Sequence, residues 1–263
     1  MCFDPSVRLL FAVSLALLSG ACRARAAPAP APVAPVAVPA PVAWRALASG
    51  VDAATLTSAD GVTQILLTRF DLTLTRAEVA VGAGWPPRPE TAAALRRRVG
   101  ALAVVNGGFF DERRAPLGLR VADGKTRAPL RKASDWGVLC LDAQRARIVH
   151  TRELPADAHA RGAIQVGPRL VVDGAPLALK PQRARRTAVA LDRAGRHLTL
   201  VIVDSPIDAN DLAARLAAAG FDTALALDGG PSTQLALEIG DTHVDLPGGY
   251  PVPDLLVLKP TPR

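Results

Sequence analysis

The 263-residue chain has few cysteines and few aromatic residues, and both shortages exclude classes of protein. Its three cysteines (Cys2, Cys22 and Cys140) form no Cys/His cluster with zinc-binding spacing. Aromatic residues make up 4% of the chain, so few side chains can stack on nucleic-acid bases, and we expect no nucleic-acid partner. The sequence also lacks a Gly-x-Ser-x-Gly elbow and a Walker-type loop, which argues against a serine hydrolase and an NTPase.

Positive charge is in excess, with 31 Lys and Arg residues against 24 Asp and Glu. A basic surface favours anionic partners, such as nucleic acid, lipid headgroups or anionic glycans. The positive charge favours a polyanion such as a phosphate-linked envelope polysaccharide, although few aromatic side chains are present to stack on bases or sugars. An arginine-rich and alanine-rich composition also follows from a GC-rich genome, so charge alone does not identify the substrate.

The N-terminal residues 1–26 have the pattern of a signal peptide. Arg8 precedes an apolar stretch, residues 9–18, which is too short to span a bilayer comfortably. Two cleavage patterns compete: residues 19–22 resemble a bacterial lipobox ending in a lipidated Cys22, and residues 24–26 form an ordinary small-x-small site.

Residues 27–43 alternate proline with alanine and valine. This composition favours polyproline II, which acts as a semi-rigid spacer. We therefore expect an exported protein, periplasmic or envelope-anchored in a bacterium, whose membrane contact is limited to an N-terminal anchor. The sequence predicts no particular oligomeric state.

The remaining segment, 44–263, is long enough for one sizeable domain. Two helices are predicted, at 90–98, where Gly100 follows, and at 208–219, where Asp208 or Asn210 caps the start and Gly220 follows the end. Apolar runs predict strands at 62–70, 72–81, 101–105, 119–122, 137–141, 147–149, 164–172, 187–191, 197–203, 223–227 and 253–258. The strands at 187–191 and 197–203 flank Asp192-Arg193-Ala194-Gly195, which predicts a hairpin. The predicted fold class is α+β, a single domain on a mixed, largely antiparallel β-sheet with a few helices.

Two apolar runs end in almost the same way. Residues 102–105 lead into Asn106-Gly107-Gly108, and residues 225–227 lead into Asp228-Gly229-Gly230. Glycine permits positive φ and close approach to the main chain, and bare N–H groups in such turns suit anions. We therefore expect the two segments to form two walls of one polar site.

Four motifs, in this order, resemble the phosphodiester glycosidase family. They are Asn106-Gly107-Gly108-Phe109-Phe110-Asp111, Gln165-Val166-Gly167-Pro168-Arg169-Leu170, Arg186-Thr187-Ala188-Val189-Ala190-Leu191-Asp192 and Leu227-Asp228-Gly229-Gly230-Pro231-Ser232-Thr233. The resemblance implies hydrolysis of sugar-1-phosphodiesters on an envelope or extracellular glycan, and it places Asp228 in the family's active-site signature. Pro231 departs from the pattern, because many members carry glycine there, and it removes one N–H from the loop.

Three residues are predicted to be catalytic. Asp228 would act on the anomeric carbon as nucleophile, base or electrostatic partner, because a carboxylate ending a buried strand is costly unless it is used. Arg186 would grip the phosphate with its guanidinium fork, and the Asn106 amide would position the sugar. The predicted substrate-binding residues are Gly107, Gly108, Asp111, Gln165, Thr187, Asp204, Gly229, Gly230, Ser232 and Thr233.

Simpler roles stay open for several of these residues. Asp228 and Asn106 are also typical of residues that cap a turn, Asp111 of one that holds its loop, and Gln165 of one in a plain turn. No cofactor is expected. As an alternative enzyme, a metal-dependent phosphodiesterase would hold a divalent cation through Asp204, Asp228 and Asn106. A non-catalytic envelope module that binds anionic glycan is the second alternative.

Overall fold

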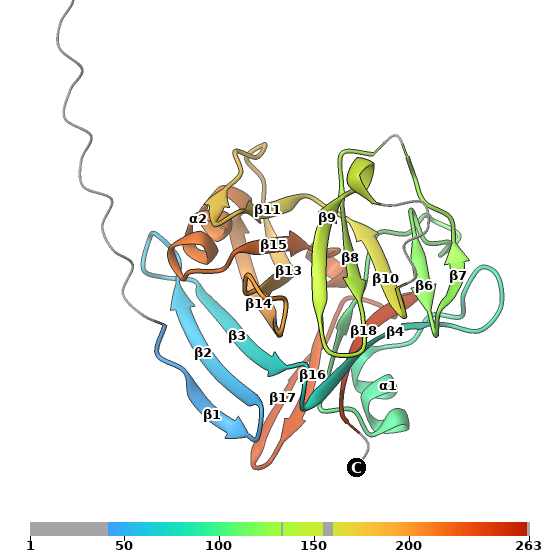
Figure 1. The fold of residues 1–263 in the computed structure, drawn as a ribbon, viewed down its shortest axis with the longest axis horizontal. Helices are drawn as coiled ribbons and strands as arrows, with labels where there is room; N and C mark the ends of the chain where they lie inside the picture. The colour runs from blue at the N-terminus through green and yellow to red at the C-terminus, as the bar shows by residue number, and fades with distance from the viewer. Residues whose placement is uncertain (1–41, 133, 155–159, 262–263) are drawn as a thin grey trace, which may run out of the picture. The chain divides into compact units, whose positions relative to one another are not determined.

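The computed structural model describes residues 42–132, 134–154 and 160–261 (Figure 1). The predicted signal peptide, with Cys22, and all but the last two residues of the predicted linker lie outside the described residues. No helix within the described ranges is long and apolar enough to cross a membrane.

The strands form one eight-stranded and two five-stranded sheets (Figure 1). The eight-stranded sheet has the order β1 (Arg45–Ala48), β2 (Val51–Thr57), β3 (Gln64–Asp71), β14 (His197–Asp208), β13 (Arg183–Leu191), β15 (Thr223–Ala226), β11 (Arg169–Val172) and β12 (Ala175–Pro176). The second sheet runs β17 (Thr242–Leu246), β16 (Leu235–Ile239), β5 (Ala103–Asn106), β18 (Asp254–Pro260) and β4 (Thr75–Val81). The third runs β7 (Lys125–Ala128), β6 (Arg120–Ala122), β10 (Gly162–Val166), β8 (Gly137–Leu141) and β9 (Ala146–His150).

The predicted α+β class with a largely antiparallel sheet and few helices is confirmed. Every pairing between the described strands is antiparallel, and the strands divide among three sheets. The main core brings all three together, with Val189 of β13, Val105 of β5 and Ile164 of β10 in one buried cluster. This shared core places the ends of these strands, and the polar residues there, close to one another.

The two α-helices cover the outer faces of two sheets. Helix α2 (Ala209–Ala218) buries Leu212 and Leu216 against the eight-stranded sheet, and Asp208 caps it as predicted by accepting from the Asn210 N–H. Helix α1 (Ala92–Val99) packs Leu95 against the sheet that contains β5. Two short 3-10 helices, η1 (Thr151–Glu153) and η2 (Gly230–Ser232), complete the elements.

Helix α1 begins later than the sequence predicted. Thr91 caps it by accepting from the Ala94 N–H, and Gly100 ends it with φ +61° as expected. Glu90 lies outside the helix, where its main chain exchanges hydrogen bonds of 3.0 Å with Val252. A threonine hydroxyl therefore satisfies the first turn, and the predicted helix start at residue 90 is too early, because α1 begins at Ala92.

The single strand predicted at 164–172 is also wrong. Strand β10 ends at Val166 and β11 starts at Arg169, and the two belong to different sheets. Pro168 has no N–H for a ladder, and its carbonyl accepts from the Ala226 N–H instead. Gly167-Pro168 thus carries the chain from one sheet to the next.

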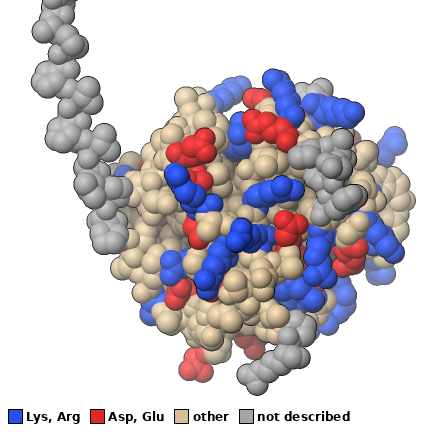
Figure 2. Space-filling model, viewed as in Figure 1, with Lys and Arg blue, Asp and Glu red and all other residues tan. Residues whose placement is uncertain are grey.

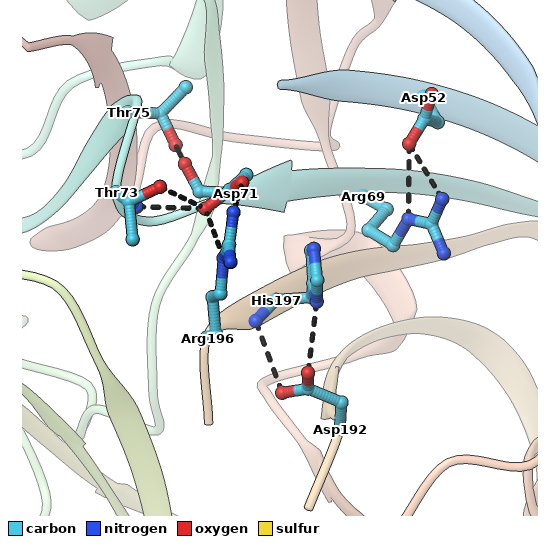
Figure 3. Close-up of polar contacts among 8 residues, drawn as sticks. All are labelled: Asp52, Arg69, Asp71, Thr73, Thr75, Asp192, Arg196 and His197. Carbon is cyan, nitrogen blue, oxygen red and sulfur yellow. Dashed lines mark hydrogen bonds and ion pairs between the residues drawn. The ribbon is translucent and has the colours of Figure 1, made fainter. Parts of the chain in front are cut away.

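The predicted break between the strands at 62–70 and 72–81 is present at residues 72–74, directly after Asp71, which is the last residue of β3 (Figure 3). Its carboxylate accepts from the main-chain N–H and hydroxyl of Thr73 and pairs with Arg196. The hydrogen bonds to Arg196 are the largest influence on Asp71 and hold its pKa below the ordinary range. Nearby, Asp192 binds the His197 ring and closes the predicted β13–β14 hairpin (Figure 3).

Candidate functional site

The two Asx-Gly-Gly segments meet, because three strand ends converge. Strand β5 delivers Asn106, and β15 leads into Asp228 beside β13. The Asp228 N–H donates to the Gly107 carbonyl (3.0 Å), and the Leu227 N–H donates to the Thr187 carbonyl (2.8 Å). Two segments more than a hundred residues apart in sequence therefore form one wall of polar main chain.

Asn106 ties these strand ends together from inside. Its side chain is fully buried, and Nδ2 donates to the Asp228 carbonyl at 2.6 Å. Its Oδ1 accepts from the Thr187 hydroxyl (2.7 Å) and the Gln234 N–H (3.2 Å). The amide is thus engaged within the protein, and contact with a sugar stays a prediction. Of the two roles left open, its bonds match the one that organises the turn.

The Asp228 carboxylate lies at this junction and is mostly removed from water. Oδ1 accepts from the Gly229 N–H (3.0 Å), and Oδ2 accepts from the Ser232 hydroxyl (2.6 Å). The Ser232 oxygen in turn lies 3.3 Å from the Tyr250 hydroxyl. Burial raises the pKa of Asp228, and these two hydrogen bonds oppose that rise without overcoming it. The neighbours of Asp228 therefore orient its carboxylate, but the ionised form is less stable than that of an exposed aspartate.

Below Gly107 and Gly108 lies a buried ion pair that the sequence analysis missed. Arg120 of β6 and Asp254 of β18 are 0% and 1% exposed, and Arg120 Nε lies 2.9 Å from Asp254 Oδ1. The Nε–H is not aimed at the carboxylate, so the contact is an ion pair without hydrogen-bond geometry. The Arg120 Nη groups donate instead to the carbonyls of Leu119, Phe109 and Gln165.

This ion pair explains the glycines of the first segment. A Cβ on Gly107 would lie 1.9 Å from Asp254 Oδ1, and one on Gly108 would lie 2.1 Å from Arg120 Nη2. The Gly107 N–H donates to the Asp254 carbonyl, and the Gly108 N–H donates to Asp254 Oδ1. The expectation of bare N–H groups at these two glycines is therefore wrong, because Asp254 already takes both. An arginine inside the apolar run at 119–122 was the one sequence signal of this pair.

Arg186 approaches the second segment from β13. Its Cδ lies 3.9 Å from where a Cβ on Gly229 would be, and its Nη2 donates to the Gln182 carbonyl. Among the described residues its buried Nε has no hydrogen-bond partner, and no ion pair joins it to Asp228. Burial lowers the pKa of Arg186, which Asp208 partly opposes. An under-partnered guanidinium of this kind favours an anionic ligand.

Gln165 and Asp111 hold loops. The buried Gln165 amide accepts from the N–H groups of Leu119 and Arg131 and donates to the hydroxyls of Ser134 and Thr151. The Asp111 Oδ1 accepts from two N–H groups of its own turn, both at 2.9 Å. The Asp111 arrangement matches the loop-holding alternative given above, whereas Gln165 lies within β10 and not in a plain turn. Substrate contact by either residue remains a prediction.

The remaining predicted residues lie around this junction or at the surface. Thr233 is fully buried, and its hydroxyl has no partner among the described residues. Gly230 adopts φ +58° with open space around its Cα. Asp204 is exposed on β14 and pairs with Arg185. No group of three or more His, Cys, Asp or Glu residues in the described ranges is arranged to hold a metal ion.

Comparison with known proteins agrees with this architecture. The model of the phosphodiester glycosidase family matches residues 99–259, and the chain belongs to this family. The matched segment runs from the last residue of α1 nearly to the end of β18, so it includes Asn106, Arg120, Arg186, Asp228 and Asp254. No curated protein matches the chain.

Three solved structures share the fold. The zebrafish N-acetylglucosamine-1-phosphodiester α-N-acetylglucosaminidase catalytic domain, auto-inhibited by its pro-peptide, has a TM-score of 0.61 at 17% identity, over 80% of this chain and 82% of that one. A Burkholderia pseudomallei protein assigned as exported has a TM-score of 0.58 at 17% identity, over 75% and 74%. A hypothetical protein from Synechocystis has a TM-score of 0.60 at 15% identity, over 83% of this chain and only 64% of that one.

Proposed function

We propose that this protein hydrolyses sugar-1-phosphodiesters on an envelope or extracellular glycan, by breaking the bond between the anomeric carbon and the phosphate oxygen. Family membership supports the reaction class. The observation that carries the proposal is the half-buried Asp228 carboxylate, held by Ser232 and Gly229 where two strand ends meet. Partial burial makes the ionised form of such a carboxylate energetically unfavourable, and positive charge that develops beside it stabilises that form.

In the proposed reaction Asp228 acts on the sugar. As the bond to phosphate breaks, the ring gains oxocarbenium-like positive charge, which an adjacent ionised carboxylate stabilises. A water molecule supplies the oxygen that ends on the anomeric carbon, and the phosphate monoester leaves with the bond's electron pair. The hydrogen bonds from Ser232 and Gly229 fix the carboxylate, so little reorganisation is needed during the reaction.

Arg186 acts on the leaving group. A phosphate monoester is a weak base, so its departure needs neutralised charge more than it needs a strong acid. The Arg186 side chain runs beside Gly229 with its Nε lacking a partner among the described residues, which suits a phosphate oxygen. Asn106 contributes as a positioning residue, since its amide fixes the main chain of Asp228.

Product analysis with matched variants tests the proposal. The purified protein is given a panel of sugar-1-phosphodiesters, and released sugar and phosphate monoester are measured. Asp228→Asn and Arg186→Ala should each lose about a hundredfold or more in kcat/KM while their thermal melts stay cooperative. The controls are Asp241→Asn, an exposed carboxylate in the β16–β17 turn, and Arg97→Ala, an exposed arginine on α1.

Near-normal turnover in either site variant removes that residue from the mechanism. Binding of glycan with no product across the panel favours a non-catalytic module. Activity that a chelator abolishes and magnesium or calcium restores favours the metal-dependent alternative instead.

A further inference from the structure

A concave surface lies away from Asp228, between the loop after β4 and the β6–β7 hairpin. It is a cleft of about 1080 Å³, lined by residues 81–85, 88–90, 98, 126 and 127. This volume is at the upper end of what small-molecule sites need, roughly 300–1,000 Å³, and is large enough for several sugar units. Figure 1 shows that the loop after β4 lies beside β7.

The cleft combines an exposed aromatic ring with positive charge. Trp85 is 61% exposed, and it is the one aromatic residue among the exposed large apolar side chains of the described residues, the others being Val62 and Leu74. Arg88, Arg98 and Arg127 line the same cleft and are exposed, against the single carboxylate of Glu90. Arg98 donates two hydrogen bonds, of 3.1 and 2.7 Å, to the Glu90 carboxylate. Glu90 therefore neutralises Arg98, and the charges of Arg88 and Arg127 remain to bind an external anion.

The loop that presents Trp85 is held at its base. The Arg88 N–H donates to the Ala83 carbonyl at 2.9 Å, and a Cβ on Gly82 would lie 2.0 Å from the Arg88 carbonyl oxygen. Pro86 and Pro87 further restrict the backbone between these contacts. Trp85 is therefore presented at a closed and stiffened turn, which lowers the entropy that a ligand must overcome to order it.

The cleft is joined to the Asp228 site through one segment. The Gly82 N–H donates to the Pro253 carbonyl, and Glu90 pairs with Val252. The next residue, Asp254, binds the Gly108 N–H beneath the strand ends. The cleft and the strand ends that carry the candidate site are therefore connected through one short segment of main chain.

We propose that this cleft is a binding site for an anionic polysaccharide, in which Trp85 stacks on a sugar ring and Arg88 and Arg127 bind its phosphate or carboxylate groups. An indole face packs well on the apolar face of a sugar, and the arginines attract polyanions of either kind. On the face drawn in Figure 2, lysine and arginine side chains lie among aspartate and glutamate side chains. The inference extends the proposed function, but binding in the cleft does not require hydrolysis.

Affinity electrophoresis of the full chain tests the site. The probes are polygalacturonate, a phosphodiester-linked polysaccharide and neutral dextran, each cast into the gel. Both charged polymers should retard the protein more than dextran, and the stronger of the two identifies the anion. Trp85→Ala and the double variant Arg88→Ala/Arg127→Ala should each weaken retardation by about tenfold in apparent Kd, and Trp85→Phe should restore most of it.

The matched control is Arg97→Ala, which removes an exposed positive charge from α1 without touching the cleft. It should bind within about twofold of the wild type, as expected for an exposed charge outside the site. Wild-type retardation of Trp85→Ala, equal retardation by dextran, or stronger binding to single-stranded DNA than to either charged polysaccharide would overturn the proposal. Because the readout is binding, a protein without hydrolytic activity still tests the cleft, and failure here leaves the hydrolase proposal intact.

Discussion

The two Asx-Gly-Gly segments look alike in sequence but differ in packing. In Asn106-Gly107-Gly108 both glycine N–H groups bind Asp254, and a side chain on either glycine would collide with the buried Arg120–Asp254 pair. In Asp228-Gly229-Gly230 a Cβ on Gly229 would lie 2.8 Å from the Arg185 carbonyl oxygen, whereas one on Gly230 would meet nothing within 4 Å. The first segment is therefore a support that is packed at both glycines, and the second is an open wall only at Gly230, two residues after the candidate carboxylate.

The difference shows that paired glycines answer two separate requirements. At Gly107 and Gly108 glycine is needed because charged side chains press against the main chain. At Gly230 it is needed for a positive φ of 58°. Sequence alone presents both cases as the same motif, and substitution separates them.

The largest expected effect is on the packed segment. Gly108→Ala places a methyl group 2.1 Å from Arg120 Nη2, and that guanidinium is fixed by three carbonyls and Asp254. We expect a loss of about 3 kcal/mol or more in the free energy of unfolding, because a buried charge must move. Denaturant titration of the variant measures it, and a loss below about 1 kcal/mol would mean that this support is not rigid.

An intermediate effect is expected in the pH dependence of activity. Burial raises the pKa of Asp228 above its ordinary 3.8, and the proposed reaction uses the ionised carboxylate. The value of kcat/KM should therefore fall by about tenfold per pH unit as pH drops through that raised pKa. A pH profile that stays flat down to pH 3.8 would contradict an ionised Asp228 in the mechanism.

The same shift has a consequence for stability with the opposite sign. A raised pKa means that the folded protein holds this proton more tightly than the unfolded chain does, so Asp228 destabilises the fold increasingly as pH rises from 3.8 through its folded pKa. Asp228→Asn should therefore gain stability relative to wild type on going from acidic to neutral pH. Thermal melts of both proteins across that range check the direction.

The smallest expected effect is on the open segment. Gly230→Ala meets no steric obstacle but must adopt φ +58°, which costs an L-residue about 1 kcal/mol. Its unfolding free energy should fall by about that amount, well short of the loss in Gly108→Ala. Equal losses in the two variants would remove the distinction between support and open wall.

Local patterns predicted much of the fold, because caps and apolar runs act over a few residues. The Asp208 cap, the Gly100 stop and the β13–β14 hairpin followed from such signals. The pattern at 164–172 was misleading, since two apolar strands separated by Gly167-Pro168 look continuous until sheet membership is known. No element was predicted at β1, β2, β16 or β17.

The site was predictable only in part for a related reason. Asn106 and Asp228 were recognisable because each follows a buried strand. Arg120 and Asp254 are 134 positions apart in the sequence, and no local pattern pairs them; only the packing of two sheets brings the charges together. The hydrogen bonds that occupy the Asn106 and Gln165 amides also come from residues distant in sequence, so no local pattern predicts them.

The most direct measurement is hydrolysis of a sugar-1-phosphodiester in water enriched in ¹⁸O, followed by mass spectrometry of both products. If Asp228 and its neighbours act on the anomeric carbon, the new oxygen is on the sugar and the phosphate monoester stays unlabelled. Label in the phosphate monoester would mean that the bond to phosphorus breaks, which contradicts a glycosidase centred on Asp228.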